Sequence, residues 1–243
     1  MNYCSKKICS ILFLLISFTV DAQEILGNDA QENLFKLGGI DATSGIVRKF
    51  DNRYEGVKGS PFWFDSWSTG SLIFENGKHV DNVQLKYNVF EDELIIHKSN
   101  EGQFYLPKES VRSFTLQHQG STENINFVKY IHPKKDSAFQ YYRLIVSGTI
   151  NLIEYIKVVF EKADFEGGYS NDKRYDEFKK YPGFYYFSEP GAKPQKLKSN
   201  PNAISKIFPG KNDQVKKYVI KSGLDCTNEK DLIQIFDYYS EIE

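Results

Sequence analysis

Alternation of apolar and polar residues dominates the middle of the chain, from Ser71 to about Leu197. In residues 83–88, VQLKYN, every second residue is apolar. A period of two places successive side chains on opposite faces of a strand, so this pattern predicts a strand buried on one face. Further runs rich in β-forming residues lie at Ser71–Phe74, Leu94–Ile96, Phe104–Leu106, Val111–Leu116, Ile125–Ile131, Phe139–Ser147, Thr149–Phe160, Phe184–Phe187 and near Leu197.

The turns between these runs are short. Asn76-Gly77 separates the first two runs, and Asn-Gly is typical of a type I′ hairpin turn, in which both residues have a positive φ. Residues 91–93 form an acidic turn, and Gly148 predicts a bulge or bend between the two longest runs. Eight to ten short strands joined in this way predict a largely antiparallel β meander, either a curled sheet or a barrel-like one.

The last 44 residues change to helical spacing. Asn200-Pro201 is typical of an N-cap followed by the first helical residue, and Pro209-Gly210 would end that helix. A second helix is expected over residues 213–222, with Gly223 at its end. Thr227 predicts the cap of a final helix with the apolar stripe Leu232, Ile235, Phe236, Tyr239 and Ile242. Each stripe covers one side only, so we expect an α+β fold with two to three C-terminal helices packed on the sheet.

The first 22 residues predict a secretory signal peptide. Lys6 and Lys7 precede a 13-residue, largely apolar run, and the small residue Ala22 ends a cleavage site. A retained N-terminal anchor is the alternative.

The rest of the chain is expected to divide into two parts. Residues 23–60 form an N-terminal extension with a short helix over 29–37, and residues 61–243 form a single α+β domain, β-rich over 61–198 and helical over 199–243. No later run is apolar and long enough for a transmembrane helix, so the mature chain is expected in the periplasm or secreted.

The composition of the chain argues against several classes of partner and site. The 243 residues carry 31 Lys and Arg against 32 Asp and Glu, a net charge of −1, which argues against nucleic acid as a partner. Cleavage after Ala22 would leave Cys226 as the only cysteine, which excludes an intrachain disulfide and a multi-cysteine metal site. Charge is nevertheless uneven: residues 172–221 carry +7 and residues 222–243 carry −5. We interpret these regions as two solvated faces, with an anion-binding patch as the alternative.

No catalytic, cofactor or metal-binding motif stands out. The four histidines, at 79, 97, 118 and 132, lie at least 14 residues apart, so no His pair has metal-ligand spacing. The loop from Asp164 to Asp172 is rich in oxygen ligands, but it does not follow the order of a calcium-binding loop. We therefore predict no cofactor and no metal. Cys226 is expected to be a small buried apolar residue rather than a reactive thiol.

The segment Phe62–Trp67, FWFDSW, is the most distinctive local feature, because it holds both tryptophans of the chain. Exposed aromatic rings beside a carboxylate suit stacking on a sugar or contact with a peptide. Trp63, Asp65 and Trp67 are therefore the candidate ligand-binding residues. The alternative is that these rings are buried and plug one end of the β structure.

Five short strings of the sequence carry a resemblance to other proteins. KGSPFWFDSWSTG, the NGK hairpin and VQLKYNVFEDELII, followed later by GGYS and YDEF, resemble a group of exported, functionally uncharacterised β-rich envelope proteins of Gram-negative bacteria. The resemblance implies export and a single β-rich unit, and it implies no activity or site residue.

Two functions remain open from the sequence. The first is an exported, non-catalytic envelope protein that binds or presents a partner protein, glycan or lipid. The second is a periplasmic or secreted hydrolase of an envelope or extracellular polymer. The hydrolase requires two or more of a set of eight acidic and histidine residues to share one concave pocket: Asp65, Glu91, Asp164, Asp172, His79, His97, His118 and His132.

Overall fold

The computed structural model describes residues 54–98, 102–132, 135–164, 174–188 and 192–243. The predicted signal peptide, the helix expected over 29–37 and Asp172 lie outside these residues. The described strands are β1 Ser68–Phe74, β2 His79–Asn88, β3 Glu93–Lys98, β4 Gly102–Leu106, β5 Val111–Gln117, β6 Asn124–His132, β7 Lys135–Val146, β8 Asn151–Glu161, β9 Glu177–Phe187 and β10 Gln195–Lys196; the helices are α2 Pro201–Ser205, α3 Asn212–Ser222 and α4 Glu229–Ile242.

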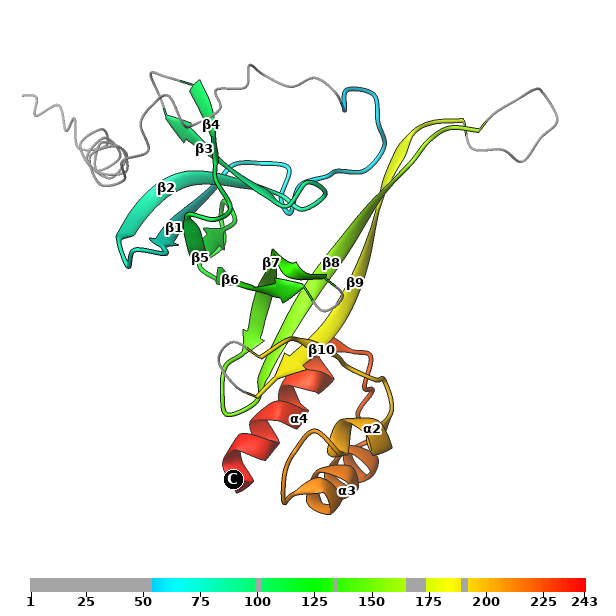
Figure 1. The fold of residues 1–243 in the computed structure, drawn as a ribbon. Helices are drawn as coiled ribbons and strands as arrows, with labels where there is room; N and C mark the ends of the chain where they lie inside the picture. The colour runs from blue at the N-terminus through cyan, green and yellow to red at the C-terminus, as the bar shows by residue number, and fades with distance from the viewer. Residues whose placement is uncertain (1–53, 99–101, 133–134, 165–173, 189–191) are drawn as a thin grey trace, which may run out of the picture.

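All ten strands belong to one antiparallel sheet with the order β10-β9-β8-β7-β6-β5-β1-β2-β3-β4. The sheet is open, with β10 and β4 as its edges, so of the two forms expected the curled sheet is the one adopted. Figure 1 shows β1–β5 curving at one end of the molecule, whereas the long β8–β9 hairpin runs from the helices past this curved part. The α+β class with C-terminal helices is confirmed.

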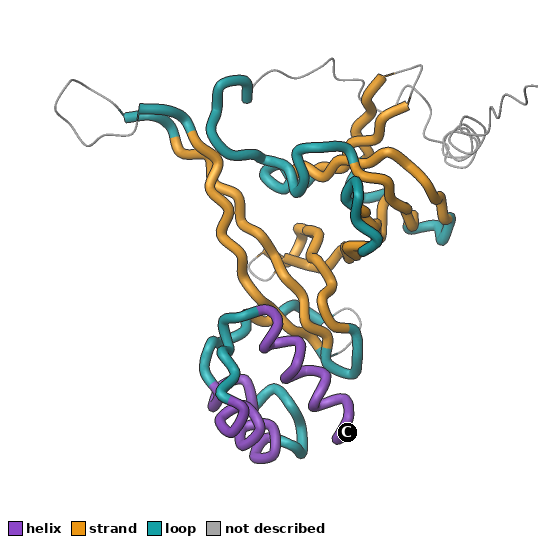
Figure 2. The backbone as a smooth tube through the Cα atoms, turned by 180° about the vertical axis from the view of Figure 1, so that it is seen from behind, coloured by secondary structure: helices purple, strands orange, loops and turns teal. Residues whose placement is uncertain are grey.

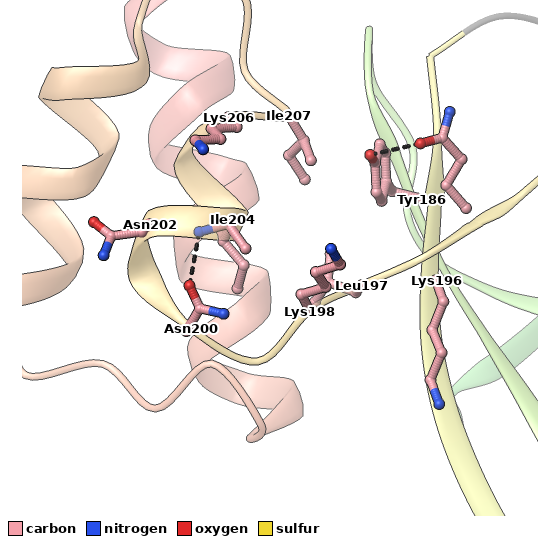
Figure 3. Close-up of a pocket in the computed structure, with 11 residues that line it drawn as sticks. Tyr186, Lys196, Leu197, Lys198, Asn200, Asn202, Ile204, Lys206 and Ile207 are labelled. Carbon is pink, nitrogen blue, oxygen red and sulfur yellow. Dashed lines mark hydrogen bonds between the residues drawn. The ribbon is translucent and has the colours of Figure 1, made fainter.

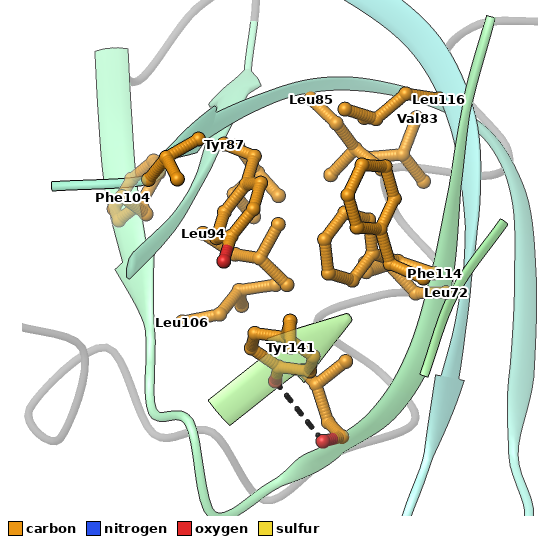
Figure 4. Packing of buried hydrophobic residues seen from close by; sticks show 14 of the residues in the cluster. Leu72, Val83, Leu85, Tyr87, Leu94, Phe104, Leu106, Phe114, Leu116 and Tyr141 are labelled. Carbon is orange, nitrogen blue, oxygen red and sulfur yellow. Dashed lines mark hydrogen bonds between the residues drawn. The ribbon is translucent and has the colours of Figure 1, made fainter. Parts of the chain in front are cut away.

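The curved part of the sheet encloses the first hydrophobic core (Figure 4). In β2, Val83, Leu85 and Tyr87 point into this core, while the polar residues between them lie on the opposite face, as the alternation predicts. Phe114 and Phe127 stack with their ring centroids 4.6 Å apart at its centre. Gly70 allows β1 to approach β5, because a Cβ at this position would lie 2.0 Å from the carbonyl oxygen of Thr115.

The helices cover one face of the lower part of β7–β9 and form a second core there (Figure 2). Leu232, Ile235 and Phe236 of α4 are at most 1% exposed, which confirms the predicted stripe. Asn200 caps α2 as expected, since its Oδ1 accepts a hydrogen bond from the backbone N–H of Ala203 at 2.8 Å.

Two local predictions were wrong in detail. Asn228, not Thr227, caps α4 by accepting from the N–H groups of Lys230 and Asp231. At the first hairpin only Gly77 has a positive φ, 82°, whereas the type I′ turn needs two. The N–H of Gly77 donates to Phe74 O, and that of Phe74 donates to Lys78 O, both at 2.9 Å. This four-residue loop gives the expected hairpin with one left-handed residue instead of two.

Residues 54–67, here called the aromatic segment, join the two sides of the curved sheet. At one end, Lys58 makes a bridge to Glu177 of β9, and the N–H of Phe178 donates to Lys58 O at 2.8 Å. At the other end, Phe62 makes a bridge to Asn88 of β2. The last residues of the predicted N-terminal extension therefore pack into the domain.

Within the described residues, no helix has the length and apolar character needed to cross a membrane. Cys226 is a buried free cysteine, 4% exposed. Burial, and to a lesser extent the neighbouring Asp225, raises the pKa of its thiol, which agrees with the expected role as a packing residue.

Candidate functional site

The aromatic segment places its two tryptophans in different environments. The backbone N–H of Trp63 donates to Tyr87 O at 2.9 Å, and the indole of Trp63 meets Phe127 edge-on with the ring centroids 4.8 Å apart. The guanidinium carbon of Arg143 lies 6.0 Å from the centroid of the Trp63 ring. Trp63 thus packs against the first core. For this one residue, the alternative that the aromatic rings are buried and plug one end of the β structure holds.

Trp67 lies on the outward face of the sheet instead. Its ring centroid is 5.4 Å from that of His97, and the ammonium group of Lys86 is 5.9 Å from its centroid. The same ammonium group lies 4.2 Å from the centroid of Phe62. Lys180 of β9 donates from its ammonium group to the carbonyl of Phe62. These contacts, with the exposed carboxylate of Asp65, define the aromatic–lysine patch: Phe62, Asp65, Trp67, Lys86, His97 and Lys180.

The two lysines of this patch are partly shielded from water. Burial lowers the pKa of both Lys86 and Lys180, and the negative charge of Asp65 opposes this effect at each of them. A cation that has lost part of its hydration gains more from an anionic or carbonyl ligand than a fully solvated one does. The patch therefore combines half-buried rings, two incompletely hydrated cations and one carboxylate.

A row of polar side chains runs beside the patch across four adjacent strands. Thr69 of β1 faces Gln84 of β2, and Gln84 faces His97 of β3. On its other side Thr69 faces Gln117 of β5. The amide nitrogen of Gln84 donates to the hydroxyl oxygen of Thr69 at 3.1 Å. With strands about 4.8 Å apart, this polar row spans about 14 Å.

Of the three candidate ligand-binding residues, the structure brings Asp65 and Trp67 into one surface patch and places Trp63 against the core. Sequence reasoning missed Lys86 and Lys180. Lys86 occupies an outward position in the alternation of β2, which is the one signal that could have suggested it. The approach of Lys180 depends on the pairing of distant segments, which no local pattern reveals.

Two of the eight residues named for the hydrolase, Asp65 and His97, both lie in the aromatic–lysine patch, whereas three others have separate partners. His79 pairs with Asp81 at 3.1 Å, His118 stacks on Phe64, and Glu91 accepts a hydrogen bond from the Tyr54 hydroxyl at 2.9 Å. A pocket between β9, β10 and α2 is lined by none of the eight. Among the described residues there is also no group of three His, Cys, Asp or Glu that could hold a metal ion.

Two partly buried charged groups were not predicted from the sequence. Asp92, which we had assigned only to a turn, accepts a hydrogen bond from the Tyr87 hydroxyl at 2.7 Å and pairs with Lys108. Burial raises the pKa of its carboxyl group, and Lys108 counteracts this rise. Tyr141 closes the same region by donating from its hydroxyl to Val111 O at 3.1 Å (Figure 4). This network ties the turn after β2 to β5 and β7.

The second buried group joins the sheet to the helices. Arg143 of β7 donates to the carboxylate of Glu154 on β8 at 2.7 Å and also pairs with Glu229 in the first turn of α4. Glu154 is 6% exposed. It lies between Leu152, which belongs to the helical core, and Ile156, which packs on the sheet core. Burial raises the pKa of the Glu154 carboxyl group, and the positive charge of Arg143 opposes this effect.

Comparisons with protein-family models, with curated proteins and with solved structures find no match for this chain.

Proposed function

We propose that this protein is a non-catalytic binding protein of the bacterial cell envelope, and that it holds its ligand on the aromatic–lysine patch. The order of charged, apolar and small residues in positions 1–22 supports export, with cleavage after Ala22 and a mature chain in the periplasm or outside the cell. The resemblance to exported envelope proteins supports the same location.

The observation that carries the proposal is the placement of Trp67 and Phe62 around the ammonium group of Lys86 on the outward face of the sheet. Aromatic rings supply flat apolar contact area, and the adjacent cations and carboxylate supply directional contacts. Sites that bind ligands without chemistry commonly combine such anchors with polar groups that set the orientation.

An extended glycan of the envelope is the ligand class that this surface fits best. The polar row beside Trp67 offers hydroxyl, amide and imidazole groups along about 14 Å, a length that matches a few sugar residues rather than a single small molecule. A lipid would leave the polar row without a role. A partner protein would need a larger contact area, of about 800 Å² on each side.

Binding can be followed with Trp67 itself. In a Trp63→Phe variant Trp67 is the only tryptophan, so its fluorescence reports contact at the patch. The titrants are soluble peptidoglycan fragments and polysaccharide purified from the envelope. We expect a saturable change in emission, and we expect Trp67→Ala to weaken binding measured by calorimetry by at least about tenfold, the effect of losing one aromatic anchor.

Phe139→Ala is the matched control, because Phe139 is an aromatic residue on β7 that is 50% exposed and lies outside the patch. This variant should bind as the unmodified protein does. Envelope vesicles or a purified envelope protein are the alternative ligands. If one of them binds saturably and Trp67→Ala abolishes this binding, the patch remains the binding surface, but its ligand is not a glycan. Equal loss of binding in both variants would refute the assignment of the patch.

A further inference from the structure

A pocket between β9, β10 and α2 forms a second surface feature, separate from the aromatic–lysine patch (Figure 3). Its volume is about 440 Å³, within the range of about 300–1,000 Å³ that is typical of small-molecule sites. The ring of Tyr186 and the side chain of Ile207 give it a partly exposed apolar lining, with Leu197 and Ile204 buried behind them. Burial raises the pKa of the Tyr186 phenol, which keeps this group neutral.

Every charged residue of the pocket lining is a lysine: Lys196, Lys198 and Lys206. None of these three ammonium groups has a carboxylate partner within the described part of the chain. Three further lysines, at 216, 217 and 221, lie on the neighbouring helix α3. The lining itself is therefore positively charged, α3 adds three lysines against its one acidic residue, Asp213, and a concave shape strengthens such a field.

The hydrogen-bonding groups inside the pocket are mainly donors. In Figure 3 the ammonium group of Lys198 projects into the space between Ile204 and Tyr186, whereas those of Lys196 and Lys206 point outward from it. Asn200 uses its amide oxygen to cap α2, which leaves its NH₂ group as a donor at the edge of the pocket. The hydroxyl of Tyr186 donates to Gln195 Oε1 at 2.9 Å, so the oxygen of Gln195 is already occupied.

We propose that this pocket binds the phosphate group of a small organic phosphate. A lysine ammonium acts as a compact point charge and suits a tetrahedral anion, whereas planar carboxylates are typically held by the fork of an arginine. The phosphate contacts Lys198 and the amide of Asn200, and the organic part lies against Tyr186 and Ile207. The same chemistry is found in free phosphate esters and in phospholipid headgroups. This inference does not depend on the function of the aromatic–lysine patch.

Calorimetric titration of the full chain with glycerol 3-phosphate at an ionic strength of about 0.15 M, where charges outside the pocket are largely screened, tests the site. We expect saturable binding with a dissociation constant in the millimolar range or below, and no binding of glycerol, which lacks the phosphate. Lys198→Gln should weaken the affinity by about tenfold, because it removes the central charge. Lys217→Gln makes the same charge change at an exposed position on α3 outside the pocket, and it should change the affinity by less than about twofold.

Sedimentation with vesicles separates the two sources of phosphate. Binding to phosphatidylglycerol vesicles that Lys198→Gln weakens and Lys217→Gln does not would assign a lipid headgroup to the pocket. Binding of glycerol 3-phosphate without such vesicle binding would assign a free phosphate ester. Absence of saturable binding to either probe would overturn the proposal, and so would an equal loss in the two variants, because that result indicates general attraction to a basic surface.

Discussion

At the scale of single residues, the charges of Arg143 and Glu154 lie inside the described part of the fold next to charged partners. Arg143 is the clearest case, because it connects β8 and α4 through two carboxylates and also lies near the ring of Trp63. An ion pair of this kind adds little net stability compared with well-packed apolar residues, but the loss of one partner leaves the other charge buried. The group therefore makes the junction of sheet, helices and aromatic segment sensitive to a single substitution.

Arg143→Met should lower the free energy of unfolding by about 3–5 kcal/mol, since Glu154 would remain buried without its cation. The double variant Arg143→Met/Glu154→Gln should recover part of this loss. Without Arg143, the pKa of Glu154 in the folded state rises further above its unfolded value of about 4.3. At a pH between these two pKa values, Glu154 is protonated in the folded protein and ionised in the unfolded chain. Stability of the single variant should therefore fall as the pH rises above the unfolded pKa. Urea denaturation between about pH 4 and pH 7 measures the free energy of unfolding of the variant and of the unmodified protein. A difference between the two that does not change with pH would contradict the role of Glu154.

At the scale of elements, the aromatic segment depends on a glycine. Gly59 has a φ of 75°, and a Cβ there would lie 2.5 Å from the carbonyl oxygen of Phe178 in β9. Gly56 has a similar φ of 81° but has nothing within 4 Å. Gly56→Ala should therefore cost only about 1–2 kcal/mol, the penalty of the left-handed conformation. Gly59→Ala should cost distinctly more and should detach the segment from β9. Thermal unfolding reports the loss of stability, and the emission of Trp63 reports detachment of the segment. An equal loss of stability in the two glycine variants would contradict the dependence of the segment on Gly59.

The elements themselves were predictable because each has a local cause. Alternation along residues 83–88 predicts β2, and the Asn200-Pro201 pair predicts the start of α2. The curvature of the sheet depends on the pairing of β1 with β5, about 40 residues further along the chain, and the bridge from Lys58 to β9 joins residues more than 100 apart, so neither was predictable from local patterns. The candidate site shows the same division: Asp65 and Trp67 are adjacent in sequence, whereas Lys180 reaches Phe62 only through the fold.

At the scale of the whole molecule, three hydrophobic clusters of the described residues share one sheet, and the two larger ones are the first core and the helical core. The helices pack on β7–β9 at one end, and the curved strands enclose the first core at the other. Phe236 is 1% exposed and meets Phe208 edge-on with the ring centroids 5.2 Å apart. Since β7, β8 and β9 contribute to both cores, we expect the two parts to unfold together.

Phe236→Ala should lower the free energy of unfolding by about 3–5 kcal/mol, the cost of removing a fully buried ring. The loss should occur in one transition that is shared by the β and helical signals in circular dichroism. Ile220→Ala on the exposed side of α3, where Ile220 is 61% exposed, should change stability by less than about 0.5 kcal/mol. Separate transitions for helices and sheet would show that the C-terminal helices are an independent module.

Hydrogen–deuterium exchange of the full chain, with and without purified envelope polysaccharide, tests the central claim most directly. A ligand on the aromatic–lysine patch should slow backbone exchange in residues 62–67 and in the adjoining parts of β2 and β3, because these amides lie under the contact. Exchange in α2, α3 and α4 should stay unchanged. Protection confined to the helices, or no protection at saturating polysaccharide, would contradict the assignment of this patch as the binding surface.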